Sequence, residues 1–321
     1  MKVLLTGPTS TAGQYILETL MTTDHDVRVL ALADSMHRVR FRDRIEMVPG
    51  DVLDPVSLAE AARGVDLVFH TALVSPTPTL WADTLDAVNV TGTRNLIAAC
   101  AGSARRMVMV TSNNIYGLHR SPAMWPLLDD DPRHAHGNPT QVAESESLIA
   151  AEDALMDAGA TGKLDYAILR PTVIAGRKCP AIETMVSTVL RNQPAQIEMQ
   201  RRLWDVMQWT HGKDLARAAL LVAEDDRARN QCFLVAGEEP ITLYDIQAMV
   251  WDILNVGRTD NPVTELASRN NIGLVKREPR KLKALGWRAE IPVRDCIEEV
   301  LGRLDFASSE SIRLPAYMLE D

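Results

Sequence analysis

Residues 1–20 read MKVLLTGPTSTAGQYILETL, and this stretch decides the fold. The apolar run within 2–6 has the length of a short buried strand. Residues 7–13 are rich in glycine and small polar residues, and residues 12–22 repeat apolar side chains at helical spacing. A strand, a glycine-rich loop and a helix in this order are typical of the first unit of an α/β fold.

The loop predicts a site for the pyrophosphate of a dinucleotide. In such loops the first glycine makes the tight turn, the second lets the backbone approach the phosphates, and the third lets the helix pack on the strand. Gly7 and Gly13 hold the outer positions, but Ser10 brings a Cβ and a hydroxyl to the middle one. There it crowds the phosphate and could also donate a hydrogen bond to it. The predicted loop contacts are Gly7, Thr9, Ser10, Thr11 and Gly13.

The remainder of the chain keeps the same rhythm. Predicted strands at 26–32, 44–48, 65–70, 106–111 and 164–169 alternate with helical patterns near 55–63, 82–101, 141–158 and 181–192. This alternation predicts an α/β fold with a doubly wound, Rossmann-like parallel sheet covered by helices on both faces. We expect residues 1–175 to form a dinucleotide-binding domain to which 212–236 return, and 176–321 to form mainly a smaller C-terminal substrate lid.

Composition narrows the partners. The chain has 321 residues, a net charge of −9, and neither an 18-residue apolar run nor a charged-then-apolar N-terminal signal. We therefore expect a cytoplasmic protein that binds a small-molecule substrate and neither nucleic acid nor membrane; a homodimer is compatible with the sequence. The cysteines, Cys100, Cys179, Cys232 and Cys296, lack metal-like spacing, so we expect reduced core thiols and no metal site.

Several short segments further along carry recognisable patterns. They are Gly50-Asp51-Val52-Leu53-Asp54, His70-Thr71-Ala72, Asn89-Val90-Thr91-Gly92-Thr93-Arg94-Asn95, Thr111-Ser112-Asn113-Asn114-Ile115-Tyr116-Gly117, Leu169-Arg170-Pro171-Thr172-Val173, His211-Gly212-Lys213-Asp214-Leu215-Ala216 and Leu285-Gly286-Trp287. In this order they resemble the extended short-chain dehydrogenase/reductase family, in its NAD-dependent epimerase/dehydratase branch. The resemblance covers nearly the whole chain.

The resemblance implies a set of cofactor contacts. Asp51 and the Val52 amide would meet the adenine. Thr71, Ala72 and Asn89 would line the cofactor groove, and Pro171 and Val173 would pass beside the nicotinamide.

Two residues of opposite charge follow the second predicted strand. Asp34, 21 residues beyond Gly13, lies near where an acid would accept the ribose hydroxyls of NAD. Arg38 could hold the 2′-phosphate of NADP, which Asp34 would repel. The cofactor is therefore NAD or NADP, with NAD favoured.

The helix after Ser112 lacks the YxxxK pair of the family, in which a lysine one turn away lowers the pKa of a phenol from about 10. Alignment on Glu152 places Glu144 and Leu148 at these two positions, whereas a shift of one residue places Ala143 and Ser147 there. No YxxxK occurs elsewhere in the chain.

Three hypotheses for the chemistry remain open. In the first, Glu144 is partly shielded from water and is the acid/base, while Ser112 holds the substrate oxygen. In the second, Tyr116, His134 or His136 takes the acid/base role. In the third, Glu144 is a solvated helix residue, Tyr116 only packs, and the redox step is lost. The leading function is an NAD(P)-dependent oxidoreductase or epimerase acting on a small hydroxyl- or carbonyl-bearing metabolite. The alternative is a non-redox cyclase, lyase or isomerase, or a binding protein with a structural cofactor.

The predicted lid gives one indication about the substrate. Met207 stands where nucleotide-sugar members of the family commonly have a diphosphate-binding arginine, which lowers the expectation of such a substrate. Arg201 and Arg202 are candidate replacements. The apolar residues Met185, Met199, Trp125, Trp204 and Trp209 indicate a hydrophobic lid.

Overall fold

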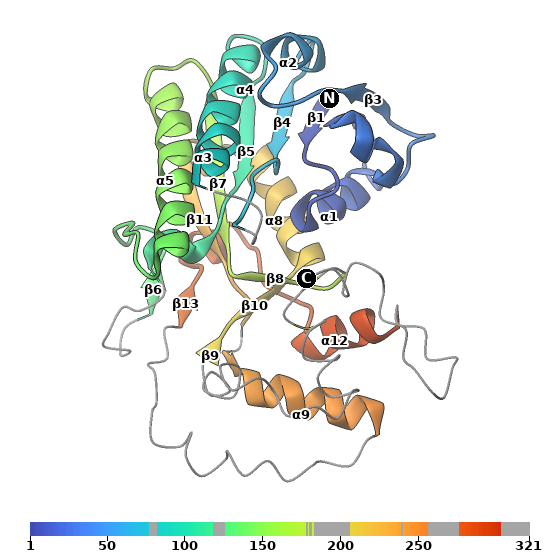
Figure 1. The fold of residues 1–321 in the computed structure, drawn as a ribbon, viewed down its shortest axis with the longest axis vertical. Helices are drawn as coiled ribbons and strands as arrows, with labels where there is room; N and C mark the ends of the chain where they lie inside the picture. Colours follow the sequence, from blue (N-terminus) through green and yellow to red (C-terminus); the bar gives the residue numbers. More distant parts are fainter. Residues whose placement is uncertain are drawn as a thin grey trace.

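A seven-stranded parallel sheet forms the centre of the computed structural model (Figure 1). The structure describes residues 1–76, 82–117, 126–177, 179, 182, 206–238, 240–255 and 276–302. The strands lie in the order β11-β7-β5-β4-β1-β2-β3 and all run parallel. Their bounds are β1 Lys2–Thr6, β2 Asp26–Ala31, β3 Glu46–Pro49, β4 Leu67–His70, β5 Arg106–Val110, β7 Asp165–Pro171 and β11 Gln231–Val235. The chain winds outward from β1 in both directions, which confirms the predicted doubly wound sheet.

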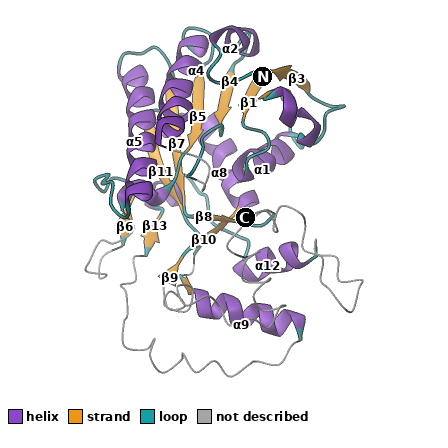
Figure 2. Ribbon diagram, in the orientation of Figure 1, coloured by secondary structure: helices purple, strands orange, loops and turns teal. Residues whose placement is uncertain are grey.

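Helices cover both faces of the sheet (Figure 2). On one face α1 (Thr11–Leu20) and α8 (Gly212–Glu224) pack on Val3, Leu5 and Phe69. On the other face lie α2 (Pro55–Ala61), α4 (Thr93–Cys100) and α5 (Pro139–Ala160). Because both faces are buried, the central strands read as continuous apolar runs, as in RMVMV of β5, rather than as alternating ones.

Shorter elements connect and extend this layer structure. The helix α3 (Ala82–Leu85) runs into η2 (Asp86–Gly92), a π-helical turn that leads directly into α4. Three further turns are η1 (Ala33–Arg38), η3 (Asn113–Tyr116) and η4 (Asp226–Ala228). Both η1 and η3 follow carboxyl ends of strands, so they lie where a ligand of an open α/β sheet is expected.

Three two-stranded ladders and three helices make up the rest of the described chain. The ladders are β8 (Val173–Ala175) with β10 (Trp209–His211), β9 (Val206–Met207) with β12 (Ile241–Thr242), and β6 (Leu127–Leu128) with β13 (Arg277–Glu278). The helices are α9 (Leu243–Leu254), α11 (Arg280–Ala284) and α12 (Val293–Leu301). Trp209 is buried between α9 and α12, in an apolar cluster that is separate from the two clusters on the faces of the sheet. Trp125, Met185, Met199, Arg201, Arg202 and Trp204 lie outside the described residues, as does the predicted helix at 181–192 apart from residue 182.

The four cysteines are buried and form no disulfide, as predicted for core thiols. Within the described ranges, no group of His, Cys, Asp and Glu is arranged to hold a metal ion. None of the helices described is both long and apolar enough to span a bilayer.

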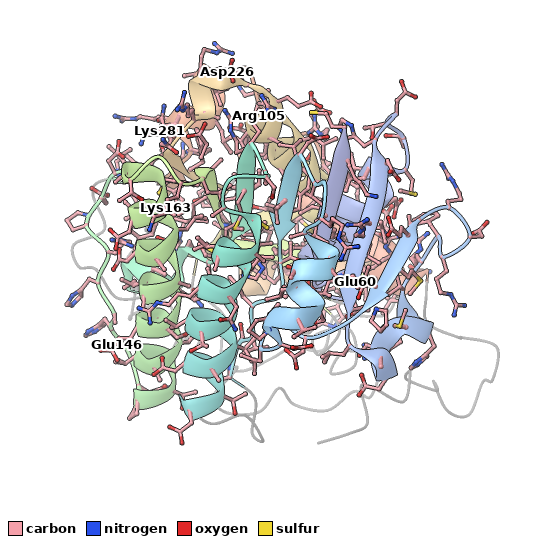
Figure 3. All side chains as sticks on the ribbon, turned by 90° about the horizontal axis from the view of Figure 1, so that it is seen from above. Glu60, Arg105, Glu146, Lys163, Asp226 and Lys281 are labelled. Carbon is pink, nitrogen blue, oxygen red and sulfur yellow. The ribbon has the colours of Figure 1, made fainter. Side chains whose placement is uncertain are left out.

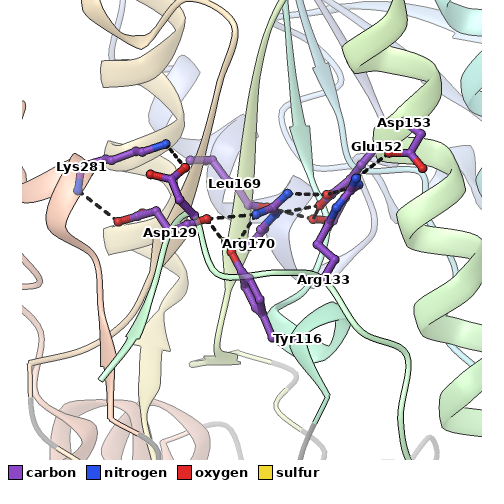
Figure 4. A network of polar contacts seen from close by, with 10 residues as sticks. Tyr116, Asp129, Arg133, Glu152, Asp153, Leu169, Arg170 and Lys281 are labelled. Carbon is purple, nitrogen blue, oxygen red and sulfur yellow. Dashed lines mark hydrogen bonds and ion pairs between the residues drawn. The ribbon is translucent and has the colours of Figure 1, made fainter. Parts of the chain in front are cut away.

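A buried ion pair fastens α5 to the sheet (Figure 4). Arg170 on β7 donates from Nε to Glu152 Oε1 (3.1 Å) and from Nη2 to Oε2 (2.6 Å), and both side chains are almost fully buried. The Thr111 hydroxyl donates to the same carboxylate at 2.7 Å. On its other side the Arg170 guanidinium donates to the Tyr116 hydroxyl (2.7 Å), which in turn donates to the Asp129 carbonyl (2.9 Å). The network therefore joins α5, β7, η3 and the loop that begins at β6.

We expect Glu152→Gln to lower the free energy of unfolding by about 3–5 kcal/mol, because the Arg170 charge would remain buried without its counter-ion. Urea denaturation followed by circular dichroism measures this difference. Asp153→Asn is the matched control, since Asp153 is half exposed and pairs at the surface with Arg133 (2.6 Å); its cost should stay below about 1 kcal/mol. Equal effects of the two substitutions would contradict a central role for the buried pair.

Candidate functional site

A cleft of about 330 Å³ opens at the carboxyl ends of β1, β2, β3 and β4. The strand order reverses at β1, and open α/β sheets bind their ligands at such a reversal. Of the residues predicted to bind a cofactor, Gly7, Thr9, Ser10, Asp51, Val52, Thr71 and Ala72 line the cleft. The other lining residues, which the sequence did not single out as contacts, are Thr6, Pro8, Leu30, Ala31, Leu32, Ser35, Gly50, Leu73, Val74 and Val88.

The two glycines of the loop sit where no side chain fits. Gly7 has a φ of 68°, and a Cβ there would lie 2.6 Å from the backbone of Thr71 and Ala72. A Cβ on Gly13 would lie 2.1 Å from the Gly7 carbonyl oxygen. Because the backbones of the loop, of α1 and of the chain after β4 are this close, the two positions admit only glycine, and the loop forms a tight turn at the edge of the cleft.

Ser10 occupies the middle position without strain. Its φ of −66° and ψ of 162° are ordinary for any residue. Its hydroxyl accepts a hydrogen bond from the Gly13 N–H (3.0 Å), which caps α1, and donates one to Thr71 Oγ1 (3.1 Å). Thr71 Oγ1 lies 2.8 Å and 2.9 Å from the carbonyl oxygens of Thr6 and Gly7. The serine hydroxyl thus holds the loop against the end of β4.

Replacement of Ser10 by alanine should lower the free energy of unfolding by about 1 kcal/mol, the usual cost of losing a helix N-cap. Ser10→Thr, which keeps the hydroxyl, should cost less than half as much. Urea titration of the three proteins under the same conditions measures the difference. If the alanine and threonine variants unfolded at the same midpoint, the capping role of the hydroxyl would be refuted.

The β2 and β3 ends form the far wall of the cleft. Leu30, Ala31, Leu32 and Ser35 come from the β2 side, and Gly50, Asp51 and Val52 from the β3 side. One Asp51 carboxylate oxygen accepts a hydrogen bond from the Leu53 N–H at 2.9 Å. Asp34 and Arg38 are exposed on η1 beside the cleft, outside its lining.

His70, the last residue of β4, is buried between two threonines. Its Nδ1 lies 2.7 Å from Thr6 Oγ1 and its Nε2 lies 3.0 Å from Thr93 Oγ1. Thr93 Oγ1 donates its proton to the Asn89 carbonyl (2.6 Å), so it accepts from the Nε2–H. Burial lowers the pKa of His70 to about 4, so the imidazole is neutral near pH 7 and its Nδ1 accepts from the Thr6 hydroxyl.

The low pKa of His70 makes stability depend on pH. An unfolded chain binds a proton at this histidine below its ordinary pKa of 6.5, whereas the folded chain does so only near 4. The contribution is therefore complete above pH 6.5 and is lost as the pH falls toward 4, by about 3 kcal/mol in all. We expect His70→Gln to flatten this part of a stability-against-pH curve. The exposed His37→Gln is the control and should follow the wild type; a His70→Gln curve parallel to the wild type would contradict the assignment.

Asn89 lies in the π-helical turn η2 and connects the cleft to α5. Its side chain accepts from the Val74 N–H (2.8 Å) and donates to the Val74 carbonyl (3.0 Å) and to Ser147 Oγ (3.0 Å). The Ser147 hydroxyl in turn donates to the Glu144 carbonyl at 2.8 Å. Helical turns of this kind are frequent at functional sites. Thr6, Thr93 and Ser147 belong to this chain of hydrogen bonds, a role that the sequence did not indicate because their partners come from distant strands and helices.

The predicted catalytic residues Ser112 and Glu144 lie on adjoining elements. Ser112 caps η3, and its Oγ accepts from the Asn114 N–H (3.1 Å). From α5, Ser145 Oγ donates to the Asn114 carbonyl (3.2 Å), so the turn of α5 that carries Glu144 abuts the turn that carries Ser112. Glu144 is 8% exposed. Among the described residues, no hydrogen bond or ion pair uses its carboxylate.

The other candidates for acid/base chemistry are placed differently. Tyr116 is fully buried, and its hydroxyl is shared between Arg170 and Asp129; burial, only partly offset by the Arg170 charge, raises its pKa well above the ordinary value. His134 and His136 are exposed on the loop before α5, with their rings stacked at 6.0 Å. Leu148, which alignment on Glu152 places at the position of the family lysine, packs in an apolar cluster with Ile115, Tyr116, Leu127 and Leu234.

Two predicted cofactor contacts, Pro171 and Val173, lie at and just after the end of β7, outside the lining of the cleft. Pro171 ends β7, and its carbonyl accepts from Asn113 Nδ2 at 3.0 Å, next to Ser112. Val173 begins β8 and is partly buried. These two residues and the catalytic candidates therefore lie together at the ends of β5 and β7, beyond the lining of the cleft.

Comparison with known proteins adds a family match. The sequence model of the NAD dependent epimerase/dehydratase family matches residues 3–236. An uncharacterized protein, 052L of Frog virus 3 (isolate Goorha), is 24% identical over 266 residues, which cover 76% of this chain and 74% of the viral protein. A monkeypox virus protein named 3 beta-hydroxysteroid dehydrogenase/Delta 5-->4-isomerase is 26% identical over 182 residues, 54% of this chain and 52% of that protein.

Solved structures share the fold. A double mutant of DesIV, a dTDP-glucose 4,6-dehydratase from Streptomyces venezuelae with NAD and DAU bound, superposes with a TM-score of 0.76 at 20% identity, over 94% of this chain and 96% of that one. At this identity the similarity establishes the architecture alone.

Proposed function

The chain belongs to the NAD dependent epimerase/dehydratase family, and on this basis we propose that it is an oxidoreductase or epimerase that uses a nicotinamide dinucleotide without the usual tyrosine–lysine pair. Its substrate is a small molecule with a hydroxyl or carbonyl group. The observation that carries the proposal is the placement of a buried carboxyl, Glu144, on the turn of α5 that touches the turn of Ser112.

The residues present fit the cofactor. The cradle of Gly7 and Gly13, which any Cβ would fill, suits a pyrophosphate together with Thr9, Ser10 and Thr11. Asp51 and Val52 would hold the adenine, Thr71, Ala72 and Asn89 the groove, and Pro171 and Val173 the nicotinamide side. When bound, the cofactor supplies hydride transfer.

The side chains of this protein would then transfer the proton and bind the substrate oxygen. Ser112 Oγ already accepts from the Asn114 N–H, so its own proton is available for a hydrogen bond to a substrate hydroxyl or carbonyl oxygen. The Glu144 carboxylate would accept the hydroxyl proton during oxidation and return it during reduction. The Ser147 and Asn89 hydrogen bonds hold the turn that carries Glu144 in place.

Glu144→Gln should keep the affinity for cofactor and lower turnover by about a hundredfold or more, the usual worth of a positioned proton-transfer group. Turnover is measured as change in nicotinamide absorbance, with a substrate taken from a screen of nucleotide sugars, alcohols and carbonyl compounds. The matched control is Glu146→Gln, because Glu146 is exposed on the outer side of the same helix (Figure 3) and should be neutral. Normal turnover of Glu144→Gln would exclude Glu144 as the acid/base.

One observation favours a second function, a non-redox cyclase, lyase or isomerase, or a binding protein with a structural cofactor. Leu148 and its apolar neighbours leave no cation one helical turn from position 144, so the usual means of lowering a phenol pKa is missing. This function would be supported if product formed with no change in nicotinamide absorbance and no deuterium passed from a labelled cofactor to the product.

A further inference from the structure

We propose that a cavity beside the edge strand β11 is a second small-molecule site, which binds a carboxylic acid through Arg133, Arg170 and the Tyr166 hydroxyl. The cavity has a volume of about 480 Å³, within the range of small-molecule sites, and lies between α5, β7, β11 and the loop after β6. Among the residues described, none lines both this cavity and the cleft, and neither Ser112 nor Glu144 lines it. The inference therefore does not rest on the proposed function.

The first observation is a phenol hydroxyl that the fold does not use. Tyr166 lines the cavity and is 7% exposed, and its ring lies where a Cβ on Gly159 would come within 2.6 Å. A buried tyrosine hydroxyl usually has a hydrogen-bond partner, yet within the described ranges no hydrogen bond uses this one. Burial raises the pKa of Tyr166, so the hydroxyl keeps its proton near pH 7. It can therefore donate to an acceptor on a molecule in the cavity.

The second observation is a pair of guanidinium groups that line the same cavity. Arg170 Nη2 and Arg133 Nη1 both donate to Glu152 Oε2, at 2.6 Å and 3.3 Å (Figure 4). Arg170 uses four of its five N–H groups within the fold, and in the described chain the fifth, on Nη2, has no acceptor. Asp153 meets Arg133 from the surface, where water screens its charge. Two cations thus share one buried carboxylate, which leaves the wall suited to a further anion.

The remaining polar residues of the lining favour a singly charged anion. Three acids, Asp129, Asp130 and Asp131, line the cavity together with Lys281, which pairs with Asp130. Figure 4 shows Asp129 and Lys281 on the opposite side of Arg170 from Arg133. Because three carboxyl groups face one lysine there, a doubly charged phosphate would be repelled. A planar carboxylate has one charge and matches the geometry of guanidinium N–H groups.

The α5 side of the cavity indicates the body of the acid. Ile149 and Met156 lie seven residues apart, so they share one face of the helix, and both line the cavity. This wall suits a compact apolar group attached to the carboxylate. A bound acid would also contact Arg170 of the buried ion pair that holds α5 on the sheet, so it should raise the temperature of unfolding.

Isothermal calorimetry with benzoate, benzamide and phenylphosphonate tests the inference. We expect benzoate to bind at least about tenfold more tightly than the neutral amide or the phosphonate. Tyr166→Phe should weaken benzoate about tenfold without lowering the urea midpoint, because its hydroxyl has no partner in the fold to lose. Arg133→Gln should weaken benzoate by a similar factor. The matched controls are Tyr15→Phe and Arg229→Gln, which make the same chemical changes outside the cavity and should leave benzoate binding unchanged.

The thiol of Cys232, which also lines the cavity, gives a readout that does not depend on a substitution. Saturating benzoate should slow the alkylation of Cys232 by iodoacetamide severalfold, measured by peptide mass spectrometry, and leave Cys100, outside the lining, unaffected. The inference is overturned if benzoate gives no heat, if benzamide or phenylphosphonate binds as tightly, or if Cys232 is not protected. Binding of benzoate that survives both Tyr166→Phe and Arg133→Gln would place the acid elsewhere and overturn it equally.

Discussion

The Glu152–Arg170 ion pair is the interaction on which the placement of α5 against the sheet depends. Two opposite charges are buried where α5 meets β7, in a forked geometry. Thr111 and Arg133 donate further hydrogen bonds to the carboxylate, and the guanidinium donates to the Tyr116 hydroxyl and the Asp129 carbonyl. Burying a charge is costly unless it is paired and fully hydrogen-bonded, so these groups are held in one arrangement. That arrangement places the turn of Glu144 against the turn of Ser112.

A second set of hydrogen bonds connects the end of β1 to the same helix. It runs from Thr6 through His70 and Thr93 to Asn89, and from the Asn89 side chain to Ser147 on α5. A neutral His70 imidazole donates from Nε2 and accepts at Nδ1, and this fixes which group donates in each of the hydrogen bonds from Thr6 to Asn89. In this part of α5, Leu148 packs in an apolar cluster, and the residue before it, Ser147, connects the helix to Asn89 by a hydrogen bond.

Polar contacts connect α12, the last described helix, to α1 and to the end of β10. Glu299 on α12 accepts hydrogen bonds from Tyr15 on α1 (3.0 Å) and from His211 Nε2 (2.9 Å). His211 Nδ1 accepts from the Lys213 N–H at 3.0 Å, which places the imidazole proton on Nε2. The Arg177 guanidinium, at the end of the strand region that follows β7, stacks on the Tyr15 ring at 4.6 Å. Helix α1, which follows the glycine loop, therefore also holds α12, which lies near the other end of the described chain.

The sequence by itself determined the doubly wound sheet, the position of the glycine loop and the absence of a YxxxK motif from the chain. These features follow from local periodicity and from the identity of single residues, such as Gly7, Gly13 and Leu148, which the chain carries wherever it folds. Only the tertiary structure decided what the polar groups do. The Ser10 hydroxyl meets Thr71 and caps α1, the Tyr116 hydroxyl is taken by Arg170, and Leu32 rather than Asp34 faces the cleft. Such pairings depend on side chains brought together from distant strands and on the rotation of a short 3₁₀ helix, and neither is encoded in the spacing of residues along the chain.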